Sequence, residues 1–407
     1  MDLAATAQAR TPAQADVRIL IGDCRDRLRE LPDRSVHCVL TSPPYWGLRD
    51  YGAEGQLGLE AAPEAYVESL VEVFREVRRV LRDDGTLWLV LGDCFAGNGG
   101  SARGGAGRPA ESSQAYAKWR RAWGGLKPKD LVGIPWRVAF ALRADGWWLR
   151  SDVVWAKKNP MPESVRDRPT RAHEYVFLLA KSRRYFYDAD AVQEPFAEAT
   201  VKRLRQASFD RQSGGAKDGL NPNRSARRAL VNLKGRAMPP QLEDRPHKAP
   251  GRNLRSVWHL GTQPFKGAHF ATFPTRLVEP CIRAGTSEAG CCPSCGTPWT
   301  RVIERERRRN IVKTGQKHDG TYYRSNPGGG VGNDRRHRQD LGWRPSCSCP
   351  RHEPAPCTVL DPFAGAGTTG LVAGRLGREA LLIELNPEYA AMARERLAAD
   401  GIEASLE

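Results

Sequence analysis

The chain has 407 residues, a formal net charge of +16 and a pI near 9.6. This length accommodates a complete α/β core with one or two smaller modules. The basic excess favours a polyanionic partner such as nucleic acid, although charge alone fits a soluble basic protein equally well. No apolar run reaches the roughly 20 residues of a membrane span, so we expect no membrane partner. Residues 1–16 lack the basic start and apolar core of a signal peptide, which predicts a flexible tail and a cytoplasmic protein.

Apolar residues indicate alternating strands and helices at both ends of the chain. The expected elements, in chain order, are strands at 17–21 and 36–40, a helix at 63–81 closed by Asp84 and Gly85, a strand at 86–91, a helix between Asp130 and Ala144, strands at 147–155, 174–180 and 358–360, a helix after a Gly-rich turn, a strand at 380–383 and a helix from Pro387. This order predicts an α/β fold with a covered sheet built from βαβ units.

Three segments interrupt this alternation. Residues 95–126 are rich in Gly, Ser and Arg, and we expect them to form a mobile loop near the active face. Residues 194–256 are polar and strongly basic, without apolar periodicity, so they form either a loop-rich recognition segment or a disordered one. Residues 291–356 carry a cysteine cluster and lie just before the final βαβ unit.

A Gly-rich turn, DPFAGAGTTG, follows the strand at 358–360 and opens a helix. Its glycines would let a ligand approach the backbone amides at the start of that helix. Glu384 ends the next strand, where its carboxylate can accept two ribose hydroxyls. Gly365, Gly367 and Gly370 also fit the dinucleotide fingerprint, so spacing leaves NAD and S-adenosylmethionine both open, beside a purely structural turn.

A second turn, TSPPYW at residues 41–46, follows an apolar strand near the N-terminus. Its two prolines stiffen the backbone and leave the carbonyls of Ser42 and Pro43 as fixed acceptors. The Ser42 side chain and the Pro43 carbonyl can accept both hydrogens of an exocyclic amine and so pyramidalise its nitrogen toward a methyl donor. Tyr45 can stack on the base. For such a triplet taken alone, a rigid turn with a buried aromatic residue is the alternative.

Together, TSPPY at 41–45 and DPFAGAGT at 361–368 resemble the DNA amino-methyltransferases of the β arrangement, in which the catalytic motif precedes the cofactor motif. Segments 23–24, 154–157 and 273–277 also match landmarks of this family. The resemblance implies a Rossmann-like methyltransferase sheet with circularly permuted motif order, in which the catalytic and cofactor strands belong to one sheet. It also implies S-adenosyl-L-methionine as cofactor and, as substrate, a base flipped out of double-stranded DNA.

The resemblance assigns the expected site residues. The expected catalytic group is Ser42, Pro43, Pro44 and Tyr45. The methionine end of the cofactor is expected to lie against Asp361, Phe363, Gly365, Gly367 and Thr368. Glu384 is expected to hold the ribose and Asp23 the adenine amine, with Phe273 as a further cofactor contact. The family usually has Ser at the first catalytic position in cytosine-N4 enzymes and Asp or Asn in adenine-N6 enzymes. Ser42 therefore favours cytosine N4, with adenine N6 as the alternative.

Four cysteines form two close-spaced pairs, Cys292 with Cys295 and Cys347 with Cys349. Such a pattern suits a four-thiolate zinc ribbon, whose metal would hold together an insert too polar to fold alone. Reduced free thiols are the alternative, and Cys291, His352 and Cys357 are substitute ligands. A catalytic metal is not expected, because methyl transfer to an activated amine needs no Lewis acid.

These patterns predict a discontinuous enzyme. The expected parts are a tail at 1–16, a catalytic half at 17–193, a basic DNA target-recognition segment at 194–256, a return to the methyltransferase domain at 257–290, a zinc-ribbon-like insert at 291–356 and a cofactor-binding half at 357–407. We expect a bacterial or phage-encoded methyltransferase that acts on double-stranded DNA, with a cognate restriction endonuclease and a homodimer as candidate partners. A non-catalytic zinc-ribbon protein that binds nucleic acid is the remote alternative, for which both turn motifs would be surplus. Methylation of RNA or of protein amides through a similar pocket is a third alternative.

Overall fold

The computed structural model describes residues 16–48, 52–53, 55–96, 126–196, 252–263, 272–306, 337–350 and 352–407. The chain divides into two compact units. The first comprises residues 1–191, 255–299 and 345–407, and the second comprises 192–254 and 300–344. Most of the loop expected at 95–126, of the tail expected at 1–16 and of the basic segment expected at 194–256 lies outside the described residues.

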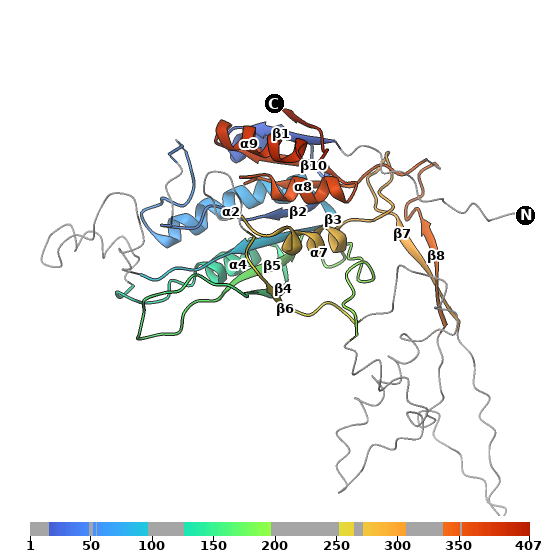
Figure 1. Cartoon of the computed structure of the whole chain (residues 1–407). Coiled ribbons are helices and arrows are strands. Elements are labelled where there is room, and N and C mark those ends of the chain that lie inside the picture. Colours follow the sequence, from blue (N-terminus) through green and yellow to red (C-terminus); the bar gives the residue numbers. More distant parts are fainter. Residues whose placement is uncertain are drawn as a thin grey trace, which may run out of the picture. The chain divides into compact units, whose positions relative to one another are not determined.

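The first unit is built on one nine-stranded sheet (Figure 1). Its strands, in spatial order, are β11 (Ala404–Leu406), β1 (Val17–Ile21), β10 (Glu379–Glu384), β9 (Thr358–Asp361), β2 (Val36–Thr41), β3 (Leu81–Leu91), β5 (His173–Ala180), β4 (Trp148–Lys157) and β6 (Val257–Leu260). All neighbours pair in parallel except at β5, which runs antiparallel to both β3 and β4. The expected α/β fold is confirmed, and the motif order is permuted as expected.

Strands from opposite ends of the chain meet at the centre of this sheet. Cys38 and Val39 of β2 pair with Val359 and Leu360 of β9. Their carboxyl ends, which carry the two turn motifs, therefore point to the same edge of the sheet. The catalytic and cofactor strands therefore belong to one sheet, as expected, and the pairing shows that they are neighbours in it.

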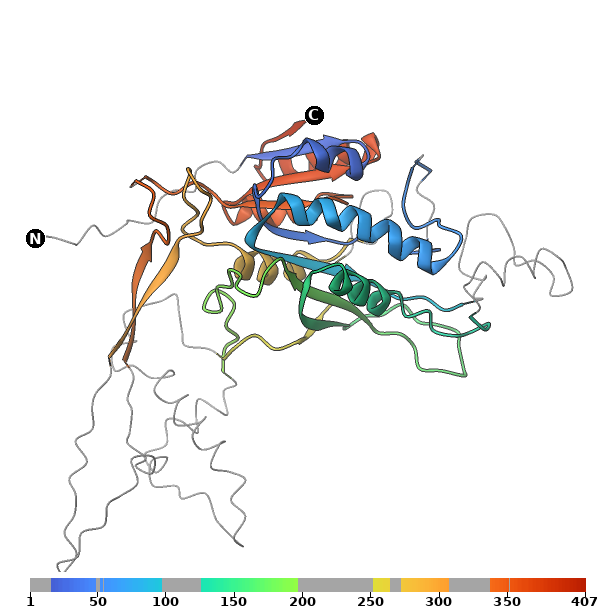
Figure 2. The ribbon, with the colours of Figure 1, turned by 180° about the vertical axis from the view of Figure 1, so that it is seen from behind.

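Helices cover both faces of the sheet. Figure 1 shows α7 (Thr275–Gly285), α8 (Thr368–Arg375) and α9 (Pro387–Ala398) on one face, and Figure 2 shows α1 (Cys24–Glu30), α2 (Pro63–Val80) and α4 (Ile134–Ala144) on the other. Leu87, Leu89 and Leu91 of β3 pack with the second group of helices in one continuous apolar core. Burying this surface on both sides of the sheet provides the main driving force for folding. None of the helices among the described residues has the length and apolar character needed to span a membrane.

Two element boundaries differ from the sequence-based expectation. Helix α2 ends at Val80, and β3 begins at Leu81, so Asp84 and Gly85 lie inside a strand rather than closing a helix. Leu81 pairs with Val36 of β2 and Thr86 pairs with Cys38, and the register shifts between these two pairs, so Asp84 and Gly85 lie in an irregular part of the strand. Helix α4 begins at Ile134 rather than directly after Asp130.

The start of α4 is capped from a distant part of the chain. Asp93, which follows β3, accepts hydrogen bonds from the amides of Gly133 at 2.9 Å and Ile134 at 3.0 Å. These amides have no partner within the helix, so an external carboxylate satisfies them. Sequence patterns search for a cap next to the helix and therefore could not find this one.

The described part of the second unit contains an antiparallel hairpin of β7 (Thr300–Glu306) and β8 (His337–Arg344). Arg301 on β7 lies over the Trp343 ring of β8, with the guanidinium carbon 4.1 Å from the ring centre. Such a cation–π contact stabilises the pairing of the two strands near the base of the hairpin.

Candidate active site

Both turn motifs open onto one cavity of about 470 Å³ in the first unit. It is lined by residues of the catalytic turn, the Gly-rich turn and the ends of neighbouring strands, including Asp23, Ser42, Pro43, Pro44, Tyr45, Trp155, Lys157, Glu174, Phe273, Phe363, Gly365, Thr368, Glu384, Asn386 and Tyr389. A volume of this size suits a drug-sized ligand. Most of the residues expected from the sequence therefore gather at one place.

The catalytic turn begins immediately after β2, where the buried Thr41 is the last strand residue. The hydroxyl of Tyr66 donates to the Pro44 carbonyl at 2.8 Å, which fixes the second proline against helix α2. The Ser42 hydroxyl lies 3.5 Å from the hydroxyl of Tyr45. Ser42 and Pro43 both line the cavity, so the two expected acceptors are available to a ligand there.

Tyr45 is fixed by a hydrogen bond at its hydroxyl and by close packing along one edge of its ring. Its hydroxyl donates to Glu174 Oε2 at 2.8 Å. Burial, followed by the negative charge of Glu174, raises the pKa of Tyr45 well above its usual value, so the phenol stays neutral. Along one edge of the ring, a Cβ on Gly92 would lie 2.5 Å from the nearest ring carbon of Tyr45, closer than any real contact. Glycine at position 92 therefore leaves the space that the ring occupies.

Sequence reasoning missed a charged pair in this cavity. Lys157 ends β4 and forms an ion pair with Glu174, the second residue of β5. The carboxyl end of β4 and the amino end of β5 meet at the cavity edge, because β5 runs against its neighbours. Segment 154–157 was recognised as a family landmark, but nothing in the sequence indicated that Glu174 would face it across a strand pair.

Asp361 lies beneath the Gly-rich turn and does not line the cavity. It is fully buried and accepts hydrogen bonds from the hydroxyls of Thr41 and Thr369, each at 2.6 Å, and from the amide of Phe363 at 3.1 Å. Burial raises the pKa of Asp361 to about 6, and these three donors limit the rise. Asp361 thus joins the strand of the catalytic turn to the cofactor turn, rather than facing a ligand.

The Gly-rich turn approaches other backbone closely. Gly367 has a φ of +70°, in the left-handed region, and a Cβ there would lie 2.9 Å from Ala393 of α9. Thr368 is buried, and its hydroxyl accepts a hydrogen bond from Arg396 at 2.9 Å. This packing fixes the start of α8, where free backbone amides favour an electronegative group.

Glu384 combines a structural contact with exposure to the cavity. One carboxylate oxygen accepts from the Gly365 amide at 2.7 Å and the other accepts from the Asn386 amide at 2.9 Å. Burial raises the pKa of Glu384. Each oxygen keeps a second lone pair, so the carboxylate can also accept the two hydroxyls of a ribose.

Asp23 also lines the cavity, but its carboxylate already has a partner. It caps helix α1 through the Arg25 amide at 2.8 Å and pairs with the Arg25 guanidinium. Burial would raise the pKa of Asp23, but the hydrogen bonds from Arg25 outweigh it, so the pKa is lowered. Phe273 lies at the same cavity, as do Asn386, Tyr389 and Met392, which the sequence did not single out.

The four expected metal ligands also come together, at a place that does not line this cavity. The sulfur atoms of Cys292, Cys295, Cys347 and Cys349 all lie within 4.8 Å of one another.

Comparison with known proteins agrees with this geometry. A family model described as DNA methylase, for N6 and N4 enzymes, matches residues 36–312 and 356–395. The Type II methyltransferase M.SmaI of Serratia marcescens is 36% identical over 380 residues, with 93% of this chain and 90% of that protein covered. M.Cfr9I of Citrobacter freundii, also a Type II methyltransferase, is 38% identical over 377 residues, with 92% and 86% covered.

A solved structure of a putative DNA modification methylase from Thermus thermophilus, complexed with S-adenosyl-L-methionine, covers 96% of this chain and 97% of its own, with 20% identity and a TM-score of 0.45. The family match spans both turn motifs and all the residues that line the cavity except Gly22, Asp23 and Cys24. The chain therefore belongs to the S-adenosylmethionine-dependent DNA methyltransferases that methylate an exocyclic amine, at N4 of cytosine or N6 of adenine.

Proposed function

We propose that this DNA methyltransferase modifies N4 of a cytosine that is flipped out of a specific site in duplex DNA. The observation that carries the proposal is the placement of Ser42, Pro43 and Tyr45 on the same cavity as the Gly-rich turn and Glu384. One part of the cavity suits the methyl donor and the other suits a planar base. Extruding the base costs about a few kcal/mol, which contacts to the DNA phosphates offset.

In this mechanism the chain's own residues prepare the amine for attack. The Ser42 side chain and the Pro43 carbonyl accept the two N–H hydrogens, so the nitrogen lone pair leaves the ring system and points at the methyl group. Tyr45 stacks on the base and is kept in place by Glu174 and by the space at Gly92. When bound, S-adenosylmethionine supplies the electrophilic methyl group, with Phe363, Gly365, Thr368 and Glu384 positioned to hold it.

Ser42 is the reason for preferring cytosine to adenine. A neutral hydroxyl stands where the family's adenine-N6 enzymes usually have Asp or Asn, and no other carboxylate or amide replaces it on the catalytic turn, residues 41–46. Adenine N6 remains the alternative substrate atom. The distinction rests on this one side chain, so the methylated atom must be measured.

The second unit carries most of the chain's net positive charge. Its residues 192–254 and 300–344 hold 25 Lys and Arg against 11 Asp and Glu, a net charge of +14 out of the total of +16. Phosphate neutralisation supplies much of the affinity of proteins for DNA. We assign DNA binding and target recognition to this unit, and methyl transfer to the nearly neutral first unit.

Base-resolved sequencing of DNA from bacteria that express the chain tests the proposal. We expect N4-methylcytosine at one recurrent sequence, at a lower level in cells that express the Tyr45→Ala protein in the same amount. Because the relatives are Type II methyltransferases, we also expect that this methylation protects DNA from an endonuclease that cuts the same sequence. Methylation of adenine alone would overturn the choice of base, and an unmodified genome would overturn the activity.

A further inference from the structure

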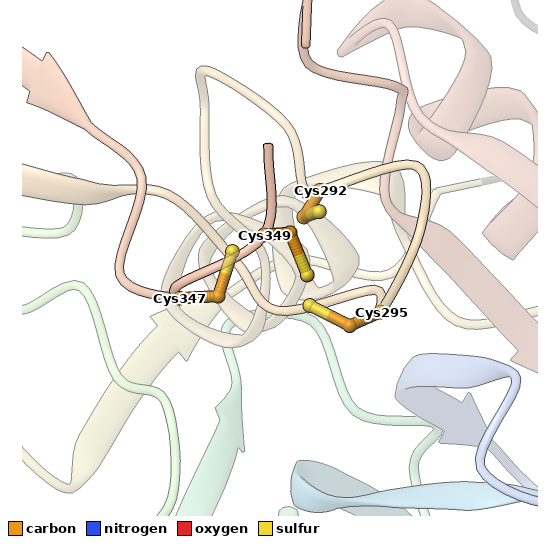
Figure 3. A group of neighbouring side chains, drawn as sticks. All are labelled: Cys292, Cys295, Cys347 and Cys349. Atoms are coloured by element: carbon orange, nitrogen blue, oxygen red, sulfur yellow. The ribbon is translucent and has the colours of Figure 1, made fainter. Parts of the chain in front are cut away.

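We propose that Cys292, Cys295, Cys347 and Cys349 bind one structural Zn²⁺, and that this ion clamps together the two chain segments that lead into and out of residues 300–344. The four sulfurs lie within 4.8 Å of one another, and Figure 3 shows the side chains turned toward a common centre. In a tetrahedral site with Zn–S bonds of about 2.3 Å, the sulfurs are about 3.8 Å apart. The observed spacing therefore needs only small adjustments to accept the ion.

The first pair of cysteines lies on a tight backbone turn. The Gly296 amide donates to the Cys292 carbonyl at 2.7 Å, and the Cys292 amide donates to the Thr297 carbonyl at 2.9 Å. Gly296 has a φ of +69°, in the left-handed region that favours glycine. This turn places the sulfurs of Cys292 and Cys295 on one side, so two ligands are preorganised before the metal binds.

The turn is anchored to the sheet of the first unit. His37 of β2 donates from Nε2 to the Gly296 carbonyl at 2.8 Å, and Arg82 of β3 donates to the Cys295 carbonyl at 2.7 Å. Both residues lie near the amino ends of their strands, whereas Ser42 follows the carboxyl end of β2. Five residues of strand separate His37 from Ser42, or about 16 Å. This distance makes the thiolate site structural and not catalytic.

A second group of candidate ligands, His37, Cys291 and Cys357, is buried nearby, but it does not suit a metal. Nδ1 of His37 accepts a hydrogen bond from the Thr358 amide at 3.0 Å, so the proton of the neutral ring is on Nε2, which donates to Gly296. Both ring nitrogens are thus engaged. This group supports the four-thiolate site by holding its backbone.

The four cysteines lie on both sides of the segment that belongs to the second unit, so a bound ion would link the two points where the chain leaves and re-enters the first unit. Cys292 and Cys295 precede the point where the chain leaves the first unit, after Trp299, and Cys347 and Cys349 follow its return at Pro345. Among the described residues, Ser346 donates to the Pro298 carbonyl at 2.6 Å between these two crossings. A metal bound by both pairs would join the crossings directly. It would thus hold together the two ends of residues 300–344, a segment with twelve Lys and Arg against five Asp and Glu.

Elemental analysis of the full-length protein, purified under reducing conditions, tests the site. We expect about one zinc per chain, and none in Cys292→Ser or Cys349→Ser protein. Cys291→Ser is the matched control, because the adjacent Cys291 thiol donates to the Pro356 carbonyl and does not belong to the group of four sulfurs. This variant should keep the zinc. Zinc-free wild-type protein, iron in place of zinc, disulfides in the intact mass, or retained zinc in both variants would overturn the proposal.

A metal exchange keeps the test decisive if the serine variants fail to fold. Chelation of the wild-type protein followed by addition of Co²⁺ alone should give the intense visible bands of a tetrahedral thiolate complex, and a spectrum typical of octahedral oxygen ligands would contradict the site.

The clamp role rests on the proposed DNA binding by the second unit. We expect metal-free protein to lose about tenfold or more in affinity for a DNA duplex, while S-adenosylmethionine affinity measured by calorimetry is kept. Unchanged DNA affinity after complete zinc removal would overturn the clamp, whereas failure of the zinc-loaded protein to bind DNA at all would overturn the proposed function and leave the zinc content as measured.

Discussion

At the scale of single residues, Asp361 shows how one buried carboxyl connects two motifs. Its oxygens accept hydrogen bonds from the hydroxyls of Thr41 and Thr369 and from the amide of Phe363. The carboxyl therefore lies between the strand of the catalytic turn and the cofactor turn. The sequence predicted that Asp361 belongs to the cofactor motif. It could not show that the side chain points away from the cavity, because this depends on the pairing of β2 with β9 across most of the chain's length.

Replacement of Asp361 by Asn should change how stability depends on pH. Burial raises the pKa of Asp361 from 3.8 to about 6, so between these values the folded protein binds more protons than the unfolded chain. The stability of the wild type therefore falls as pH rises through this window, by up to about 3 kcal/mol, whereas Asn carries no charge to bury. Denaturant unfolding at pH 4.5 to 7.5 should show Asp361→Asn gaining stability relative to the wild type as pH rises. Parallel curves for the two proteins would mean that Asp361 is not a buried titrating group.

Replacement of Tyr45 should separate stacking from positioning. Tyr45→Ala removes base stacking of about 1–3 kcal/mol, so kcat/KM should fall by about five- to 150-fold. Tyr45→Phe keeps the ring and removes only the hydrogen bond to Glu174, so its loss should be smaller. Steady-state kinetics gives both values, and calorimetry should show much smaller changes in S-adenosylmethionine affinity. Equal losses in the two variants would assign the role to the hydroxyl and contradict stacking.

At the scale of elements, the strand ends decide which residues reach the cavity. The two turns at the ends of β2 and β9 could be predicted because Pro and Gly leave a strong local pattern after an apolar strand. Glu174 and Lys157 could not, because they depend on the reversed direction of β5. The Asp93 cap on α4 also depends on a contact distant in sequence, because its two partners are 40 and 41 residues away. Local patterns therefore do not reveal it.

The end of β3 offers a test of this arrangement through Gly92. Alanine at position 92 would bring a Cβ to 2.5 Å from the Tyr45 ring, so the ring must move and kcat should fall by about tenfold or more. A double-mutant cycle provides the control, because Gly92→Ala should cost little once Tyr45 is already Ala. Additive losses in the cycle would show that Gly92 acts on something other than the Tyr45 ring.

At the scale of the whole molecule, most of the net positive charge lies in the second unit, whereas the cavity and both turn motifs lie in the first. The sequence predicted a basic recognition segment at 194–256, but residues 300–344 belong to the same unit. The reason is that two segments distant in sequence can form one unit, which composition read in chain order does not reveal. The prediction of separate roles for the units follows from their net charges.

Neutralising part of this charge should weaken DNA binding in a salt-dependent way. Replacement of Arg307, Arg308 and Arg309 by Gln should lower the affinity for DNA and reduce the slope of log affinity against log salt by about 0.9 for each phosphate that is no longer neutralised. Arg29→Gln and Arg75→Gln, at exposed positions of the first unit, are matched controls and should leave the slope unchanged. Fluorescence anisotropy across a salt series measures the slope. An identical slope in the triple variant would place the phosphate-binding residues elsewhere.

The most direct test of the central claim is the identity of the methylated nucleoside. Purified protein, incubated with duplex DNA that contains its recognition sequence and with isotopically labelled S-adenosylmethionine, should yield labelled N4-methylcytosine on mass spectrometry of the digested DNA. Labelled N6-methyladenine would keep the amine-activating cavity and contradict the inference from Ser42. Labelled 5-methylcytosine would contradict the mechanism itself, because methylation at carbon requires a covalent nucleophile, usually a thiolate, which the turn from Ser42 to Tyr45 does not provide.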